Sequence, residues 1–293
     1  MALFFLVFGL VATVNNLSGK KEAICFLEKR YRGLMVPYFL WSFIYASSLG
    51  SNAFIGILYG TNPSLGYAGT NQVLWFLPAM FCSAILFQIL ISVSCYFKSR
   101  RKFVVYIIEI VICSIVSLLL KHIRPNIGII WGIDISFTGT VLMMIGMLLR
   151  PVVDKIYKLK KIKVLILSLI CILVGGVFAQ FNVPKESWVS IMAVAFYGKS
   201  YLLFVALAVI SIIGILCVSI LIEKCTLFAW LGENSLLLMA LHYIILRALA
   251  IICEKYCHFT NMITAILCAM FCVIICIPLV YAINKFAPVL KGK

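Results

Sequence analysis

Charged residues are scarce in this chain, and histidine is scarcer still. Only 12% of the 293 residues are charged, histidine occurs three times, and residues 51–72 carry no charge at all. Hydrophobic residues, in contrast, make up 65% of the chain, and the mean hydropathy is +1.16. Because no soluble domain carries so much apolar surface, this composition excludes that class and predicts a polytopic membrane protein.

The motifs of soluble enzymes are missing as well. The sequence has no Walker loop, no GxGxxG, no GxSxG elbow and no HExxH. It has no CxxC pair, and most of its 12 cysteines lie in apolar runs, where cysteine acts as a small hydrophobic residue. Cys268, Cys272 and Cys276 lie four residues apart, and we interpret them as helix-packing residues rather than ligands of a soft metal. We predict no metal site.

Nine apolar segments follow one another along the chain. Most of them approach the roughly 20 residues that cross a bilayer, so we predict an all-α fold, a polytopic membrane helix bundle of about nine transmembrane helices. These segments and their short connections use up the length, which favours a single domain over residues 1–293. The segments lie at residues 2–14, 34–49, 73–97, 103–120, 127–149, 164–181, 201–222, 227–252 and 263–283.

The net charge of +16 comes mainly from basic residues in short connections. This distribution fixes the orientation of a membrane protein, so we expect no nucleic-acid partner. Because basic connections face the cytoplasm, we expect a cell-membrane protein with its C-terminus inside. Lys121 and Arg124, in an outer connection, are the exception. The basic connections hold Lys20, Lys21, Lys29, Arg30 and Arg32; Lys98, Arg100, Arg101 and Lys102; Arg150, Lys155, Lys158, Lys160, Lys161 and Lys163; and Lys285, Lys291 and Lys293.

The outer connection at residues 59–75 is rich in glycine, asparagine and aromatic residues. Such a surface suits stacking and hydrogen bonding to a sugar. It equally suits a turn at the membrane interface that is anchored by a tryptophan. The sequence leaves both interpretations open.

Polar side chains also lie inside apolar segments. An ionisable group in hydrocarbon costs roughly 2.5 kcal/mol or more, so it normally faces protein, water or a partner. We expect Glu109 to snorkel or to pair with the nearby basic connection. Asp134 is expected in the outer half of the membrane, either in a functional site or at a helix N-terminus.

The stretch at residues 230–242, WLGENSLLLMALH, places a polar group of residues and a histidine in one segment. Ser235 and His242 are seven positions apart and share one helix face. We expect Asp134, Ser235 and His242 to line a cavity within the bundle. The alternative is a packed His242 that bonds to Ser235 or to a carbonyl of a neighbouring helix. Asn234 and Ser235 are expected to cap the first helical turn.

Six short blocks cover nearly the whole chain in a fixed order. They are residues 1–9 (MALFFLVFG), similar to a "HMPLFFFISG" helix; 29–41 (KRYRGLMVPYFLW), similar to a basic segment leading into "PYFFW"; 74–81 (LWFLPAMF), with a "WFL" start; 131–150 (WGIDISFTGTVLMMIGMLLR), similar to "D.a......iG.ll"; 197–204, similar to "yGn…F"; and 231–242, similar to "GkNSL…H". Taken together and in register, these blocks resemble the acyltransferase 3 family of integral membrane acyltransferases.

The resemblance implies a ten-helix enzyme that moves an acyl group, commonly acetyl, from cytoplasmic acyl-CoA to a hydroxyl of an extracytoplasmic carbohydrate. The most similar type is the polysaccharide O-acetylases related to fucose 4-O-acetylase. The implied partners are membrane lipid, a carbohydrate acceptor and acetyl-CoA or another acyl-CoA as donor, with no bound cofactor. The donor's phosphates match the cytoplasmic basic residues, and a hydroxyl acceptor needs a base for its proton.

The chain departs from the family pattern in two places. The family's first helix, which carries an essential histidine after an arginine, has no counterpart here, so we assign no catalytic residue. His242 matches a later histidine and does not take that role. The family's cytoplasmic RxxR pair maps to Arg30 and Gly33, with Arg32 one residue away. The resemblance implies that Arg30 and Arg32 bind acyl-CoA; alternatively they only fix the topology.

Two other functions stay open beside a membrane-bound O-acyltransferase. A transporter or flippase of a lipid-linked sugar would carry inverted repeats and broken helices in matching positions, and the sequence shows neither clearly. A catalytically inactive fragment of the family is the other alternative, because the first helix is missing. We favour the acyltransferase, since six blocks in the family's order support the resemblance.

Overall fold

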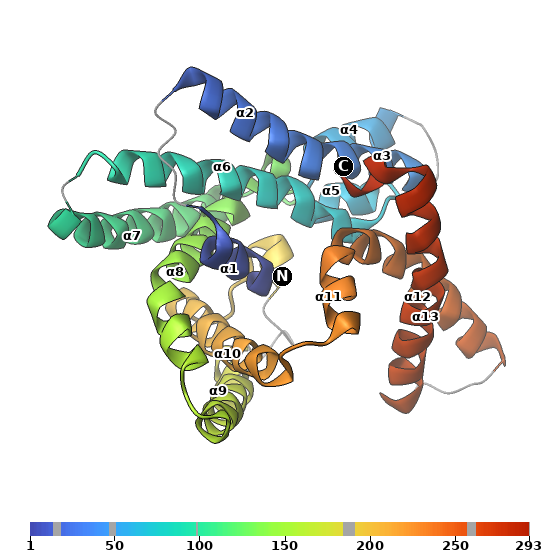
Figure 1. Cartoon of the computed structure of the whole chain (residues 1–293). Helices are drawn as coiled ribbons and strands as arrows, with labels where there is room; N and C mark the ends of the chain where they lie inside the picture. The colour runs from blue at the N-terminus through green and yellow to red at the C-terminus, as the bar shows by residue number, and fades with distance from the viewer. Residues whose placement is uncertain (14–18, 47–50, 98, 184–190, 257–261, 293) are drawn as a thin grey trace. The chain divides into compact units, whose positions relative to one another are not determined.

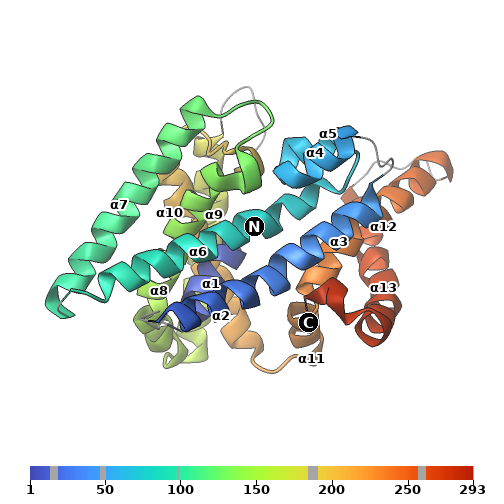
Figure 2. The same cartoon turned by 90° about the horizontal axis from the view of Figure 1, so that it is seen from above.

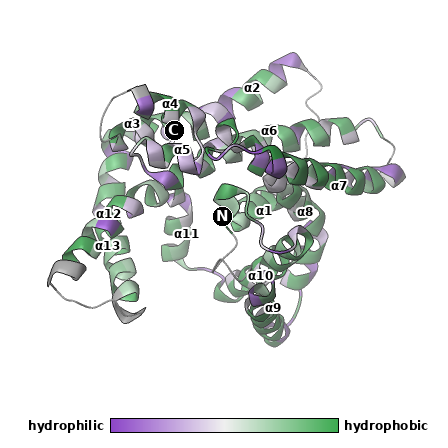
Figure 3. Cartoon of the chain, turned by 180° about the vertical axis from the view of Figure 1, so that it is seen from behind, coloured by the Kyte–Doolittle hydropathy of each residue, from purple (hydrophilic) through white to green (hydrophobic). Residues whose placement is uncertain are grey.

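The computed structural model describes residues 1–13, 19–46, 51–97, 99–183, 191–256 and 262–292, and nearly all of them are helical (Figure 1). Within these ranges there is no β-strand, and one isolated bridge joins Ile191 to Phe196. Apolar residues dominate the helices (Figure 3). The prediction of an all-α, polytopic helix bundle is confirmed.

In the part of the chain that the structure describes, seven helices are long and apolar enough to cross a membrane. About nine were predicted. The difference arises at the segments 2–14 and 34–49, whose helices α1 (Ala2–Val11) and α3 (Val36–Tyr45) have ten residues each. The chain is therefore a multi-pass membrane protein. The spans are Gln72–Ser94, Arg101–Ile123, Ile130–Tyr157, Lys161–Asn182, Tyr201–Ile222, Ser235–Ile252 and Ala265–Phe286.

The remaining elements follow the predicted segments, with additions in the connections. The basic connection forms α2 (Lys20–Arg30), which continues through a π-helical turn, η1 (Tyr31–Met35), into α3. The other helices are α4 (Ser51–Tyr59), α5 (Asn62–Tyr67), η2 (Gln72–Trp75), α6 (Phe76–Ser94), α7 (Ser99–Ile123), η3 (Ile130–Gly132), α8 (Ile133–Tyr157), α9 (Lys161–Asn182), η4 (Met192–Val194), α10 (Tyr201–Ile222), α11 (Thr226–Glu233), α12 (Ser235–Tyr256), α13 (Met262–Phe286) and η5 (Pro288–Lys291).

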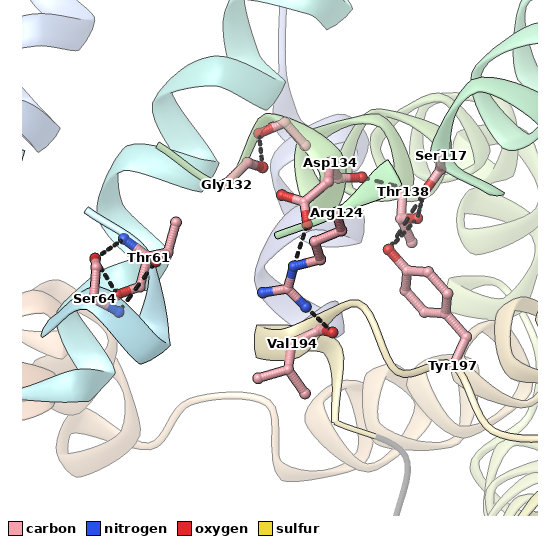
Figure 4. Close-up of polar contacts among 10 residues, drawn as sticks. Thr61, Ser64, Ser117, Arg124, Gly132, Asp134, Thr138, Val194 and Tyr197 are labelled. Atoms are coloured by element: carbon pink, nitrogen blue, oxygen red, sulfur yellow. Dashed lines mark hydrogen bonds and ion pairs between the residues drawn. The ribbon is translucent and has the colours of Figure 1, made fainter. Parts of the chain in front are cut away.

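Polar residues of the chargeless connection cap two of its helices, α5 and η2. Thr61 and Ser64 form a capping box at the start of α5 (Figure 4). The Thr61 hydroxyl accepts from the Ser64 amide at 3.2 Å, and the Ser64 hydroxyl accepts from the Thr61 amide at 2.9 Å. Each side chain satisfies an amide that the first helical turn leaves free.

Contacts group the chain into two compact units. Unit 1 contains Met1–Cys25 and Ala79–Lys224, and unit 2 contains Phe26–Pro78 and Cys225–Lys293. In unit 1, α1 packs on α8, and α9 runs beside α10 (Figures 1 and 2). A Cβ at Gly9 would collide with the backbone of Met143. A glycine therefore lets the two helices approach closely, as is common in membranes.

Unit 2 is built around α12, α13 and α3. Helix α12 packs against α13, and η5 packs against α3. The indole nitrogen of Trp41 donates to the carbonyl of Leu290 at 3.0 Å, and the Tyr38 hydroxyl donates to the carbonyl of Ile57. The first bond joins α3 to η5, near the end of the chain, and the second joins α3 to α4.

Candidate functional site

A buried ion pair lies at the start of α8 in unit 1. Asp134 is in the first turn of that helix, and its side chain is 0% exposed. Arg124, which follows α7, is 10% exposed, and its Nε lies 2.8 Å from the Asp134 Oδ2. The Arg124 guanidinium also donates to the carbonyl of Val194 (Figure 4). An isolated buried charge costs several kcal/mol, so each partner depends on the other.

The backbone on both sides of this pair takes conformations that L residues rarely adopt. Trp131 and Gly132, directly before α8, have φ values of 55° and 63°, and Ala195, directly after Val194, has a φ of 54°. A non-glycine residue in the left-handed region costs on the order of 1 kcal/mol. Such strain persists where the surroundings impose it, and it gathers at functional sites.

Four hydroxyl groups form a network next to the pair. The Ser117 Oγ lies 2.7 Å from the Thr138 Oγ1, which lies 2.9 Å from the Tyr197 hydroxyl and 3.4 Å from that of Tyr201. The Ser117 hydroxyl also donates to the backbone carbonyl of Asp134 at 3.2 Å (Figure 4). Burial raises the pKa of Tyr197 to about 12, so its hydroxyl stays protonated at neutral pH. The arrangement joins α7, α8 and the segment before α10 through buried hydrogen bonds.

Sequence reasoning missed most of this network. Asp134 was a predicted site residue, but Arg124, Ser117 and Tyr197 were not. Arg124 could have been found from the sequence, because it is a basic residue in an outer connection, whereas most basic residues lie in the connections predicted to be cytoplasmic. A cation in an outer connection, ten residues before an intramembrane carboxylate, indicates a pair.

Ser235 and His242 lie on α12 in unit 2, and both are half-buried. The His242 Nδ1 lies 3.1 Å from the carbonyl of Leu238, one turn earlier in the same helix. The carbonyl of His242 accepts from the Cys272 thiol of α13 at 3.8 Å. The cavity that we expected Asp134, Ser235 and His242 to share combines residues of both units and stays a prediction.

Asn234 does not cap α12 as expected. Its Oδ1 accepts instead from the Asn284 amide at 3.0 Å and from the Lys291 ammonium at 2.7 Å, while its Nδ2 donates to the carbonyl of Trp230 at 2.9 Å. The reason is that α11 ends directly before Asn234, so its side chain is used to hold the break between α11 and α12. No sequence pattern indicates α11 as a helix separate from α12.

Glu109 also differs from its expected setting. It is buried in α7, and its two carboxylate oxygens accept from the Ser94 hydroxyl at 2.9 and 2.8 Å. Among the described residues, Glu109 therefore has the Ser94 hydroxyl as its partner instead of a lysine or arginine of the basic connection. The Ser94 hydroxyl has one hydrogen to donate, and both carboxylate oxygens share it.

The two arginines proposed to bind the acyl donor have different surroundings. Arg32, in η1, is exposed and forms an ion pair with Glu28 at 2.6 Å. Arg30, at the end of α2, lies over the ring of Phe26, 5.2 Å from its centre, and burial lowers its pKa. An arginine remains charged under such a shift, so both guanidinium groups can bind phosphate. Their role stays a prediction.

Comparison with protein families gives one result for nearly the whole chain. The model of a family described as "Acyltransferase domain", acyltransferase 3, matches residues 1–282. In comparisons with curated proteins and with solved structures, nothing matches the chain. The family match covers both units, and it agrees with the multi-pass helical architecture and with the ordered sequence blocks. The chain therefore belongs to the acyltransferase 3 family of membrane acyltransferases.

Proposed function

We propose that this protein is an O-acyltransferase of the cell membrane that moves an acyl group, in the first instance acetyl, from cytoplasmic acyl-CoA to a hydroxyl of an extracytoplasmic carbohydrate. The family match over residues 1–282 is the observation that supports it most strongly. The basic connections support a cytoplasmic C-terminus and an inner face that attracts the phosphates of the donor.

The reaction joins the acceptor to the acyl carbon. The acceptor oxygen attacks the thioester carbonyl, a C–O bond forms and the C–S bond breaks. The acceptor proton passes through a base to the departing sulfur, so that the products are an ester and free CoA. For the chain's own residues we propose that Arg30 and Arg32 bind the donor's phosphates. The Arg124–Asp134 pair keeps the Tyr197 network in position.

Transfer can be measured with membranes from cells that do or do not produce the full chain. The membranes receive acetyl-CoA labelled in the acetyl group, and the label is followed into polysaccharide as an alkali-labile ester. We expect incorporation only where the chain is present. Equal incorporation in both membranes would contradict the proposal.

Donor binding can be tested with variants in α2 and in η1, which continues it. Replacing both Arg30 and Arg32 by glutamine should raise the KM for acetyl-CoA about tenfold or more, since hydrogen bonds to charged groups contribute about 1.5–3 kcal/mol each. The matched control replaces Lys20 and Lys21, two exposed residues at the start of the same α2 helix, by glutamine. Equal KM values in the two double variants would show that the arginines only fix the topology.

A further inference from the structure

Unit 2 contains a cavity whose lining residues have been given no role so far. Its volume is about 300 Å³, which is at the lower end of the range for small-molecule sites. One wall is the turn between α5 and η2, and the others come from α3 and α12. The lining residues are Tyr45, Gly66, Gly69, Thr70, Asn71, Gln72, Tyr243, Ile244 and Arg247.

The walls are fixed by buried hydrogen bonds. The carbonyl of Ala240 accepts from the Tyr45 hydroxyl at 2.7 Å and from the Asn71 amide at 3.1 Å. The Thr70 hydroxyl donates to the carbonyl of Leu65 at 3.1 Å. Gly69, with a φ of 66°, makes the turn. These groups are already satisfied, so the cavity is formed before any ligand arrives.

Three other lining side chains are free to bind. Among the residues that the structure describes, the side chains of Gln72, Tyr243 and Arg247 form no hydrogen bond or ion pair. Gln72 and Arg247 are exposed, and Tyr243 is half-buried. No acidic residue lines the cavity, so Arg247 gives it a single positive charge.

This combination indicates the chemistry of the ligand. A guanidinium offers a planar pair of donors that matches a carboxylate or a phosphate. The Gln72 amide can donate to and accept from sugar hydroxyls, and the two tyrosine rings offer apolar faces to a sugar ring. An uncharged lipid chain would leave the guanidinium without a partner, and a small inorganic anion would not use the rings.

We propose that this cavity binds an anionic sugar, a carbohydrate with a carboxylate or phosphate group, through Arg247, Gln72 and Tyr243. That the sugar is the acyl acceptor rests on the proposed function. The expected topology agrees, because the chargeless connection that builds one wall is predicted to be extracytoplasmic. The second interpretation of this connection, an interfacial turn, would leave the cavity without a ligand.

Binding can be measured on the purified full chain in lipid nanodiscs, without acyl donor, by isothermal titration calorimetry. The probes are tetragalacturonate, glucose 1-phosphate and the neutral maltotetraose. We expect at least one of the two anions to bind at least tenfold more tightly than maltotetraose. Tighter binding of tetragalacturonate would identify the charged group as a carboxylate, and tighter binding of glucose 1-phosphate would identify it as a phosphate.

Variants then locate the site. Arg247→Gln should weaken anion binding about tenfold to a hundredfold, and Arg247→Lys, which keeps the charge but loses the planar donors, should weaken it less. Lys199→Gln is the matched control, because Lys199 is an exposed cation of another predicted outer connection. The proposal is overturned if no anion binds, if the neutral probe binds as tightly, or if Arg247→Gln and Lys199→Gln behave alike.

The measurement separates this proposal from the function itself. Acetyl transfer to a neutral polysaccharide, together with no anion binding, would overturn the anionic-sugar site and leave the O-acyltransferase in place. Anion binding that depends on Arg247, in a chain that transfers no acetyl group, would support the cavity as a sugar site and overturn its role in acyl transfer.

Discussion

Arg124 in unit 1 and Arg247 in unit 2 are two arginines in a chain with few charges, and their surroundings are opposite. Arg124 is 10% exposed and paired with Asp134, whereas Arg247 is exposed, lines a cavity and has no ion-pair partner among the described residues. The first has its counter-charge in Asp134, and the second has none in the described part of the chain, so a ligand can supply it. The comparison separates a charge that maintains the fold from one that is available to a ligand.

The largest effect is expected when one partner of the buried pair is removed. Asp134→Asn leaves the guanidinium of Arg124 buried without a counter-charge, which should lower the free energy of unfolding by about 3–5 kcal/mol. Denaturant unfolding in detergent micelles measures the change. A loss smaller than about 1 kcal/mol would show that the pair is not a stabilising element.

Removing both charges should cost less than the two single changes together. In the double variant Arg124→Gln with Asp134→Asn, no charge is left unpaired, so a double-mutant cycle should give a coupling of about 1–3 kcal/mol. Additive single effects in the same unfolding experiment would contradict the proposed dependence of each partner on the other.

A smaller effect is expected from the hydroxyl network. Tyr197→Phe removes the hydrogen bonds to Ser117 and Thr138 and should cost about 1 kcal/mol. Burial raises the pKa of Tyr197 from 10 to about 12, so its contribution is fully present below pH 10 and is lost as the pH rises towards 12. The difference in stability between the parent and Tyr197→Phe should therefore shrink over this interval; a constant difference would contradict it.

The smallest effect on stability is expected at Arg247. Since its side chain makes no hydrogen bond or ion pair within the described part of the chain, Arg247→Gln should change the free energy of unfolding by less than about 0.5 kcal/mol. Thermal unfolding of the ligand-free protein checks this. A change as large as that of Asp134→Asn would mean that both arginines serve the fold.

Most of the fold could be predicted from the length and composition of the apolar segments, because a bilayer leaves few structures open to such a segment. The breaks within an apolar segment, where one helix ends and another begins, could not be predicted. Residues 227–252 read as one segment, yet Asn234 separates α11 from α12 through bonds to Asn284 and Lys291, about 50 or more positions later. No local pattern contains such distant partners.

The candidate site was predictable only in part, for the same reason. An intramembrane carboxylate signals a partner, so Asp134 could be singled out, but its partner's identity depends on where α7 ends. Tyr197 joins the network because a connection returns to α8, and Tyr243 and Arg247 meet the glycine-rich turn because α12 packs there. These encounters are properties of tertiary packing.

The last residues of the chain are part of the architecture of unit 2. Trp41 donates to the carbonyl of Leu290, and Lys291 reaches Asn234 at the junction of α11 and α12. Shortening the protein before Pro288 would thus release the junction from which α12 carries Tyr243 and Arg247 to the cavity.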